Sequence, residues 1–341
     1  MSATPESLGY RMPAEWEDHD ATWLSWPKDP NTFPPQILPA VEQAYVKMVR
    51  SLGEHEEVRI LVEDEKSESR VASMLGGRVR VSFQRQSTVD VWVRDYGPTF
   101  IKGRHGAVVK WIFNAWGNKY ADLLPDNEAG EMLAESTGLP VFRPGVVLEG
   151  GSIDVNGSGS VLTTEQCLLN RNRNPGLGIR RLETILKENL GVSNVIWLGN
   201  GIEGDDTDGH IDDVARFVGP RRVVVAAELN TADPNHDALA ADRDLLEGAA
   251  DESGSSLEVV EIPMPARLDV AEGRLPASHM NFYIGNGAVL VPTFEGETDK
   301  EAIRILEEIF PRREVHGIDC RALVYGLGTI HCVTQQVPST S

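Results

Sequence analysis

Four stretches of the chain share one pattern: a run of apolar residues, a glycine-containing turn, and a second apolar run. Apolar runs interrupted by such a short turn are typical of two antiparallel strands. We therefore predict four β-hairpins, at residues 98–111, 152–163, 214–226 and 280–291.

Segments with apolar residues spaced for one face of a helix lie between the hairpins. They predict helices at residues 127–137, 179–190, 237–250 and 301–310, the last opened by a capping box of Thr298 and Glu301. Before the first hairpin, the pattern predicts helices at 39–53 and 67–75 and strands at 58–62 and 79–83. Residues 1–36, rich in Pro and Trp, are expected to form an extended lead-in that packs on the body of the protein.

A unit of hairpin, helix and strand thus recurs roughly every 60–70 residues, which indicates radial or solenoid repetition. The alternative is an open α/β sheet. The sequence contains no linker or low-complexity stretch, so we expect a single α/β domain over residues 1–341.

The composition places limits on the partners of the protein. With 41% hydrophobic residues the chain of 341 residues is ordinary for a soluble globular protein, but its net charge is −20. Such a surface repels a phosphate backbone, so no nucleic-acid partner is expected, and it attracts small cations. The same acidity is equally consistent with a role in solubility alone.

Cysteine usage and the absence of apolar spans predict a location. The three cysteines are Cys167, Cys320 and Cys332, and the first ten residues show no export segment. No stretch approaches the length of a membrane span. We expect a cytoplasmic protein with reduced thiols and no membrane partner, and a homo-oligomer is left open.

Polar residues cluster just before each hairpin and again before the end of the chain. These clusters are residues 90–98, 148–151, 205–212, 276–281 and 328–332. If every unit brings its strand end to a common axis, the clusters converge. The site predicted in this way contains one thiol, one imidazole and three carboxylates: Cys332, His210, Asp95, Glu149 and Asp212.

Neighbouring residues receive more ordinary interpretations. His210 and Asp212 are expected to alternate along one strand, so that both face the same side. His331 is expected to point away from Cys332 if that segment is extended. Cys167 and Cys320 are interpreted as structural cysteines, and Trp92 and Trp116 as aromatic walls. Asp205, Asp206 and Asp208 are interpreted as a solvated acidic loop, in which one carboxylate could hold a substrate amine.

The predicted site suits a planar cation. A guanidinium group offers five N–H donors in fixed directions, which Asp95 and Asp212 could accept in pairs. The Cys332 thiolate would attack the central carbon, and His210 would protonate the departing nitrogen. Glu149 would bind the guanidinium and share protons with His210. Because carboxylates raise the pKa of a thiol, we expect the bound cation to help form the thiolate.

The motifs at residues 12–16, 92–98, 148–151, 208–212 and 328–336 resemble the agmatine deiminase family, which is grouped with the Porphyromonas-type peptidylarginine deiminases. The resemblance implies a pentein fold, a five-bladed α/β propeller with pseudo-fivefold symmetry. It also implies hydrolysis of agmatine to N-carbamoylputrescine and ammonia, without cofactor or metal, with Cys332 as nucleophile. The catalytic residues of the family match Asp95, Glu149, His210 and Asp212. The substrate-binding candidates are Asp90, Trp92, Trp116, Asp208, Asn281 and Gly328.

One departure and several alternatives accompany this resemblance. The family usually has Asn where Asp208 stands, and often an acidic residue near Asn200, so the resemblance leaves the contact to the substrate amine unassigned. A peptidylarginine deiminase would need an open site, and a free-arginine deiminase would need a cation such as Arg94 or Arg216. Two other classes are a polyamine-binding protein and a metallohydrolase in which His210, Asp212, Glu149 and Cys332 bind a divalent metal, although the spacing fits no standard zinc signature.

Overall fold

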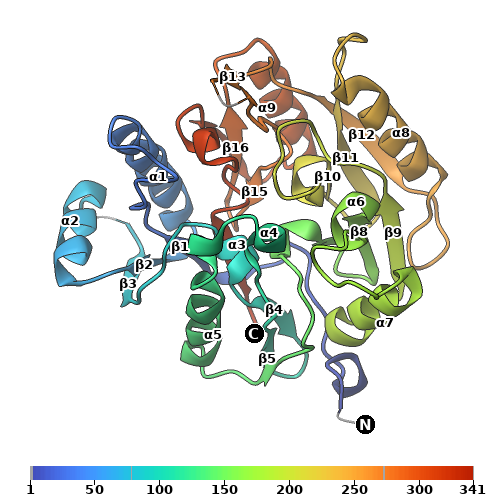
Figure 1. Cartoon of the computed structure of the whole chain (residues 1–341), viewed down its shortest axis with the longest axis horizontal. Coiled ribbons are helices and arrows are strands. Elements are labelled where there is room, and N and C mark those ends of the chain that lie inside the picture. The colour runs from blue at the N-terminus through green and yellow to red at the C-terminus, as the bar shows by residue number, and fades with distance from the viewer. Residues whose placement is uncertain (1–2, 78, 272, 341) are drawn as a thin grey trace.

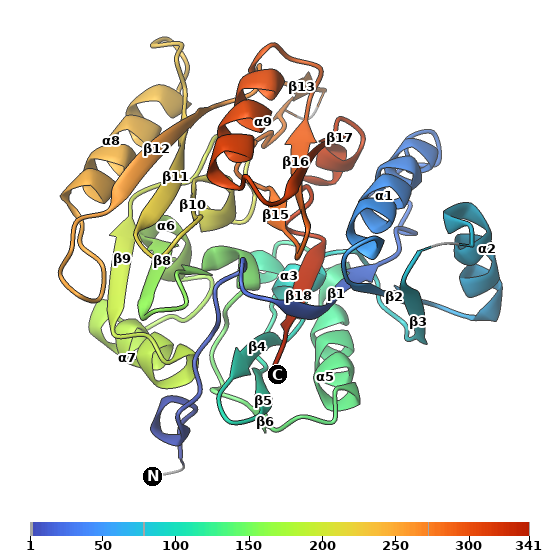
Figure 2. The same cartoon turned by 180° about the vertical axis from the view of Figure 1, so that it is seen from behind.

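The computed structural model describes residues 3–77, 79–271 and 273–340. The strands of this part of the chain form five sheets of three or four strands and one separate two-stranded hairpin, β13 (Asp269–Val270) and β14 (Gly273–Arg274). The longer helices lie around the outside of the molecule, and short helices and turns fill the middle (Figure 1; Figure 2 shows the reverse face). No described helix is both long and apolar enough to cross a membrane.

Four of the sheets repeat one unit. Two antiparallel strands are joined by a short turn, a helix follows, and a third strand lies parallel to the second. The units are β4 (Thr99–Lys102), β5 (Gly106–Val109), α5 (Asp126–Ser136) and β6 (Val141–Phe142); β7 (Asp154–Val155), β8 (Ser160–Thr164), α7 (Ile179–Leu190) and β9 (Asn194–Leu198); β10 (Ala215–Phe217), β11 (Arg222–Ala227), α8 (Asn235–Gly248) and β12 (Glu258–Pro263); β15 (Tyr283–Ile284), β16 (Ala288–Thr293), α9 (Thr298–Ile309) and β17 (Glu314–Asp319). The four predicted hairpins and the four helices between them are confirmed.

The fifth sheet joins the two ends of the chain. Its order is β18-β1-β2-β3, in which β18 (Thr334–Pro338) is antiparallel to β1 (His19–Ser25). Strands β2 (Glu57–Val62) and β3 (Val81–Arg85) follow α1 (Leu38–Gly53) and α2 (Glu65–Leu75), as predicted, and run parallel to β1. The lead-in packs on the body but contains a strand that the pattern did not predict. The alternative of one open sheet is wrong, because the described strands divide among separate sheets.

The predicted capping box at α9 is also wrong. Thr298 is the first residue of the helix, so its side chain cannot cap from the preceding position, and its hydroxyl has no partner among the described residues. Glu301 instead binds Arg304 through its carboxylate. The segment before α9 is held by Asp299, which accepts hydrogen bonds from the backbone N–H groups of Phe294 and Gly296.

Short elements between the units carry the polar clusters to the middle of the molecule. They are η1 (Glu6–Leu8), α3 (Val93–Tyr96), α4 (Ala115–Asn118), η2 (Ala121–Leu123), η3 (Gly150–Ser152), α6 (Glu165–Leu168), η4 (Ile211–Asp213) and η5 (Leu323–Gly326). Helix α3 holds Asp95 and packs against α5. A side chain at Gly130 of α5 would put its Cβ 1.8 Å from the carbonyl oxygen of Tyr96. Glycine therefore sets the distance between α5 and α3.

We expect Gly130→Ala to lower the free energy of unfolding by roughly 1–3 kcal/mol, because the added methyl group must push α5 away from α3. The matched control is Gly248→Ala at the end of α8, where the new Cβ meets no atom within 4 Å. That substitution should be neutral or stabilising by about 0.4–1 kcal/mol. Urea unfolding of both variants measures the difference, and equal stabilities would contradict the close contact.

Candidate active site

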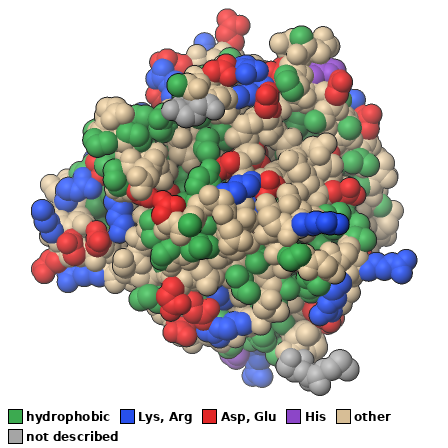
Figure 3. All heavy atoms as spheres, viewed as in Figure 1, with side chains coloured by type: hydrophobic (Ala, Val, Ile, Leu, Met, Phe, Trp, Pro, Cys, Tyr) green, Lys and Arg blue, Asp and Glu red, His purple; other side chains and the backbone are tan. Residues whose placement is uncertain are grey.

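A cavity of about 200 Å³ lies where the clusters meet. Acidic side chains gather around the hollow near the middle of the face in Figure 3. Its walls contain no Lys, Arg or His among the described residues. The lining residues are Asn31, Thr32, Asp90, Trp92, Asp95, Trp116, Tyr120, Asp122, Leu123, Asp206, Thr207, Tyr325, Gly326, Leu327, Gly328 and Cys332. Of the predicted site residues, six therefore line the cavity: Asp90, Trp92, Asp95, Trp116, Gly328 and Cys332.

Asn281 fixes the turn that carries Cys332. Its side-chain oxygen accepts hydrogen bonds from the Thr329 hydroxyl (2.9 Å) and from the backbone N–H groups of His331 (3.0 Å) and Cys332 (3.3 Å). Its side-chain nitrogen donates to Cys332 Sγ at 3.1 Å. Asn281 does not line the cavity, so the structure places it as the support of the sulfur.

Gly328 allows Trp92 to approach the same turn. A Cβ at this position would lie 2.5 Å from Cζ3 of the Trp92 ring and 3.2 Å from Cys332 Cβ. The glycine is required because any side chain would occupy the space beside the sulfur. The wall that Trp92 forms next to Cys332 therefore depends on this glycine.

The Asp95 carboxylate is held by two donors. Its Oδ1 accepts from the backbone N–H of Gly151 and its Oδ2 accepts from Trp116 Nε1, both at 2.9 Å. Burial raises the pKa of Asp95, and His210 opposes this shift. Each oxygen keeps a further acceptor site, so the carboxylate can bind a cation in the cavity without losing its anchors.

His210 lies beside this carboxylate but behind the wall of the cavity. Its Nδ1 is 3.9 Å from Asp95 Oδ2, and its Nε2 is 3.9 Å from Glu149 Oε2. Burial opposes the charged imidazole, but Asp95, Cys167 and Glu149 raise its pKa well above the ordinary value. His210 precedes the turn η4, so the prediction that it alternates with Asp212 along a strand is wrong. The structure nevertheless brings both side chains to the same place, since a Cβ at Gly151 would contact each of them.

Glu149 is fully buried and does not line the cavity. Its Oε1 accepts from Arg173 Nε at 2.7 Å, and its Oε2 has no partner among the described residues. Burial would raise the pKa of Glu149, but Arg173 and His210 lower it below the ordinary value. Glu149 can therefore accept a proton or a hydrogen bond through Oε2, while Oε1 stays bound to Arg173.

Asp212 is linked to the sulfur and to a residue that the sequence interpretation set aside. Its Oδ2 accepts from the Cys332 thiol at 3.7 Å and lies 2.6 Å from Nδ1 of His331. The other nitrogen of His331, Nε2, lies 2.9 Å from Glu15 Oε2. The segment around His331 is a turn rather than extended, so this imidazole is held between two carboxylates behind Cys332.

Two buried arginines complete this network. Arg216 Nη2 lies 2.9 Å from Glu15 Oε1, and Arg94 Nη2 lies 3.4 Å from Glu15 Oε2. Arg216 also donates to Asp154, and Arg94 donates to Gln336. Neither arginine lines the cavity, so neither can serve as the cation that a free-arginine deiminase would need.

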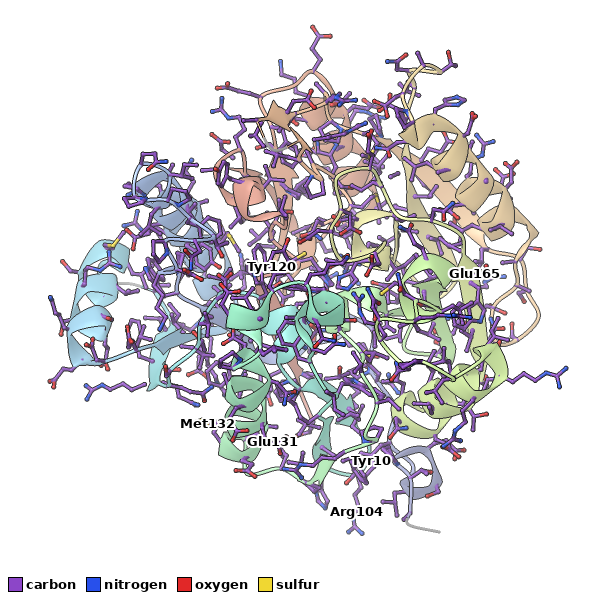
Figure 4. All side chains as sticks on the ribbon, viewed as in Figure 1. Tyr10, Arg104, Tyr120, Glu131, Met132 and Glu165 are labelled. Atoms are coloured by element: carbon purple, nitrogen blue, oxygen red, sulfur yellow. The ribbon has the colours of Figure 1, made fainter. Side chains whose placement is uncertain are left out.

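Two carboxylates of the acidic loop, residues 205–208, have different surroundings. Asp208 does not line the cavity, because its carboxylate binds Lys119 (2.7 Å), Arg173 (2.5 Å) and Asn172 (2.8 Å). Asp206 does line it, and burial raises its pKa to about 6. Tyr120 donates a hydrogen bond to Asp206 and lies near the centre of the face (Figure 4).

Asp90 is the fourth acidic side chain of the wall, together with Asp95, Asp122 and Asp206. Its Oδ2 accepts from the Thr32 hydroxyl (2.6 Å) and from Trp92 Nε1 (2.9 Å). Burial raises the pKa of Asp90 to about 6. This carboxylate orients the Trp92 ring beside the sulfur.

The comparisons with known proteins agree with this geometry. The model of the family described as Porphyromonas-type peptidyl-arginine deiminase matches residues 11–338. The agmatine deiminase of Stutzerimonas stutzeri is 38% identical, with 99% of this chain and 98% of the relative covered.

Solved structures show the same mixed α/β fold. The agmatine deiminase of Enterococcus faecalis has a TM-score of 0.91 and 32% identity, and the comparison covers 100% of this chain and 99% of that one. An agmatine deiminase of C. jejuni with substrate bound has a TM-score of 0.87 and 31% identity, with 97% of both chains covered.

The environment of the sulfur leads to a prediction about its reactivity. Burial raises the pKa of Cys332 well above the ordinary value, and Asp212, Asp213 and Asp95 raise it further. We expect Asp212→Asn to lower this pKa, because an amide removes the negative charge nearest the thiol. Alkylation by iodoacetamide measured across pH should then begin at lower pH than in the native protein.

The control for this measurement is Asp122→Asn, at an exposed position of the cavity wall. It should leave the alkylation profile unchanged, because solvent screens an exposed charge. Thermal unfolding checks that both variants are folded. A profile for Asp212→Asn that stays the same or moves to higher pH would contradict the electrostatic account.

Proposed function

The chain belongs to the Porphyromonas-type peptidyl-arginine deiminase family, and from this premise we propose that it is an agmatine deiminase. The reaction hydrolyses agmatine to N-carbamoylputrescine and ammonia. The observation that carries the proposal is the cavity itself: it holds the Cys332 sulfur and four carboxylates, and none of its described lining residues is cationic. Such a site attracts a substrate with a positive charge at each end.

The guanidinium group fits between Asp95 and Asp212. Asp95 faces the cavity with free acceptor sites on both oxygens, and Asp212 Oδ1 has no partner among the described residues. A planar cation paired with both carboxylates presents its central carbon to the sulfur, which lies 3.7 Å from Asp212. Trp92 and Trp116 supply the aromatic walls.

The residues around the guanidinium carbon, Cys332, His210 and Glu149, then carry out the reaction. The Cys332 thiolate adds to it, and the C–N bond to one terminal nitrogen breaks as that nitrogen takes a proton from His210 and leaves as ammonia. The product of this step is a thiouronium joined to the sulfur. Water, which gives a proton back to His210, attacks the same carbon and releases the ureido product and the thiol. The unpartnered oxygen of Glu149 lies 3.9 Å from His210, beyond direct hydrogen-bond reach, so the two side chains must approach each other to share this proton.

The distal amine of agmatine fits Asp206, and we propose this carboxylate as its partner. Asp206 lines the cavity with Cys332, and only one of its carboxylate oxygens receives the hydrogen bond from Tyr120. The carboxylate of free arginine would face Asp206, Asp122 and Asp90 without a cation. An arginine within a peptide would bring a neutral backbone to the same place, so the wall favours agmatine over both alternatives.

The first test is a comparison of agmatine, arginine and a blocked arginine peptide as sources of ammonia. We expect turnover of agmatine at least about 100-fold more efficient than turnover of the other two, since the blocked peptide lacks the amine that Asp206 would bind and the carboxylate of arginine is repelled by the acidic wall. Higher kcat/KM for the peptide than for agmatine would favour a peptidylarginine deiminase and contradict the proposal.

A matched pair of variants tests the amine contact. Asp206→Asn should lower kcat/KM for agmatine by about 10- to 100-fold, the cost of one charge-assisted hydrogen bond in a buried place. Asp122→Asn, which removes an exposed carboxylate of the same wall, should change it by less than about threefold. Equal effects of the two substitutions would contradict a specific role for Asp206.

Substrate binding should also assist the nucleophile. The bound guanidinium offsets the carboxylates that raise the pKa of Cys332, so this pKa should fall when the cavity is occupied. The measurement is the ultraviolet absorbance of the thiolate across pH, with and without a guanidinium analogue, using Cys332→Ser as the blank. An unchanged thiol pKa would count against substrate assistance.

We propose the finer fold as well: the five units form the blades of a propeller around a pseudo-fivefold axis. The common strand order of four sheets and the closure of the fifth, in which β18 pairs with β1, support this arrangement. So do the outward helices and the convergence of polar turns in the middle (Figures 1 and 2). In a crystal structure, rotation by one fifth of a turn should superpose each unit on the next, and unequal rotations would contradict the propeller.

We keep the cytoplasm as the proposed location. The three cysteines are all buried and unpaired in the structure, which suits a compartment that keeps thiols reduced. Fractionation of cells that produce the protein tests this, and recovery from the medium or an oxidising compartment would contradict it.

A further inference from the structure

Cys167 lies next to two residues of the proposed reaction, although it has no part in the reaction. It belongs to the short helix α6, whereas Glu149 precedes η3 and His210 precedes η4. One donor atom from each of these three residues lies within 4.8 Å of the other two. All three side chains are buried, and their exposed fractions do not exceed 1%.

Several polar atoms of this triad have no hydrogen-bond partner among the described residues. These atoms are Glu149 Oε2 and both ring nitrogens of His210. Glu149 Oε2 and His210 Nε2 point toward each other at 3.9 Å, too far apart for a direct hydrogen bond. A buried polar group without a partner destabilises the folded protein, because it has lost its hydrogen bonds to water. The unpartnered atoms therefore indicate a place for a ligand with affinity for nitrogen, oxygen and sulfur together.

We propose that Cys167, His210 and Glu149 form an inhibitory site for a divalent cation of the zinc class. Thiolate, imidazole and carboxylate are the donors that zinc takes in proteins, at about 2.0–2.3 Å. Donors at these distances lie about 3.3–3.8 Å apart around a tetrahedral ion, so the triad, with 3.9 Å between His210 and Glu149 and at most 4.8 Å between any two donors, must contract by up to about 1 Å on binding. Three protein ligands leave a fourth position for water.

The charges and the surroundings fit this assignment. The cation displaces the proton of the Cys167 thiol and the proton that His210 carries to the ring nitrogen that binds it, and the thiolate and the Glu149 carboxylate then balance its charge. Arg173 keeps its bond to Glu149 Oε1 at 2.7 Å, which fixes the carboxylate with Oε2 directed at the ion. The triad lies next to the cavity, because Asp95 lines the cavity and its carboxylate is 3.9 Å from Nδ1, the other ring nitrogen of His210.

A bound cation would remove His210 and Glu149 from proton transfer while leaving Cys332 free. The inhibition rests on the proposed function, but the binding itself does not. The site shares His210 and Glu149 with the metal centre considered from the sequence, but Cys167 replaces Cys332 and Asp212 takes no part. The two sites can be separated because each contains its own cysteine.

The test uses Co²⁺ as a spectroscopic substitute for zinc on the full-length protein. We expect a near-ultraviolet thiolate-to-cobalt charge-transfer band in the native protein and in Cys332→Ala, because the proposed sulfur donor is Cys167. The band should be absent in Cys167→Ala and in Cys167→Ser. The matched control is Cys320→Ala, which removes another buried cysteine and should keep the band.

Inhibition provides the second readout. Zinc should lower ammonia release by the native protein, and Cys167→Ser should raise the half-inhibitory zinc concentration at least about tenfold. If Cys167 variants do not fold, loss of the band in His210→Ala, with the band kept in Cys332→Ala, supports the same site. No band in the native protein, or a band that depends on Cys332 and not on Cys167, would overturn the proposal. A band without any catalytic activity would contradict the proposed function and leave the metal site standing.

Discussion

The structure depends on the pairing of charges that are buried behind Cys332. Glu15 binds Arg216, Arg94 and His331, and His331 binds Asp212 next to the sulfur. Removing one partner from such a network costs roughly 3–5 kcal/mol, because the remaining charge stays buried without compensation. The network therefore joins the N-terminal lead-in to the turn that carries the thiol. It fixes Asp212 where a cation at the sulfur must meet it.

This pairing explains how a strongly acidic cavity coexists with a stable protein. The carboxylates behind the wall are neutralised by arginine or imidazole, as Glu149 is by Arg173 and Asp154 is by Arg216. Those in the wall, Asp95 and Asp206, keep acceptor sites toward the cavity, although His210 lies 3.9 Å behind Asp95. The negative electrostatic potential of the site is therefore directed into the cavity, where a cationic substrate can pair with these carboxylates. The selectivity that we propose, for a substrate with a cation at each end, has the same physical origin.

Local signals made much of the fold predictable. The hairpins could be located because a glycine turn between two apolar runs is a short-range pattern, and the helices because their apolar faces repeat. Strand β1 was missed because its neighbours, β2 and β18, come from residues 57–62 and 334–338, and pairing at such a separation leaves no local mark. The repeated order of elements was sufficient to expect that the polar turns would meet.

In the site, the sequence did not predict the directions in which several side chains point. The sequence places Asp205, Asp206 and Asp208 in one loop, but the positive φ of Asp208, +67°, helps turn its carboxylate toward Lys119 and Arg173 and leaves Asp206 in the wall. The same holds for His331, whose role depends on a turn where an extended segment was assumed. Cys167 was interpreted as structural because nothing in its own segment points to His210.

The central claim is that the Cys332 sulfur forms a covalent bond to the guanidinium carbon held by Asp95 and Asp212. The most direct measurement is the intact mass of the protein quenched in acid within one turnover with agmatine, followed by identification of the modified peptide. The account predicts an added mass of agmatine less ammonia on the peptide that contains Cys332, and none in Cys332→Ser. Release of ammonia by Cys332→Ser at the native rate, or an adduct on another residue, would contradict it.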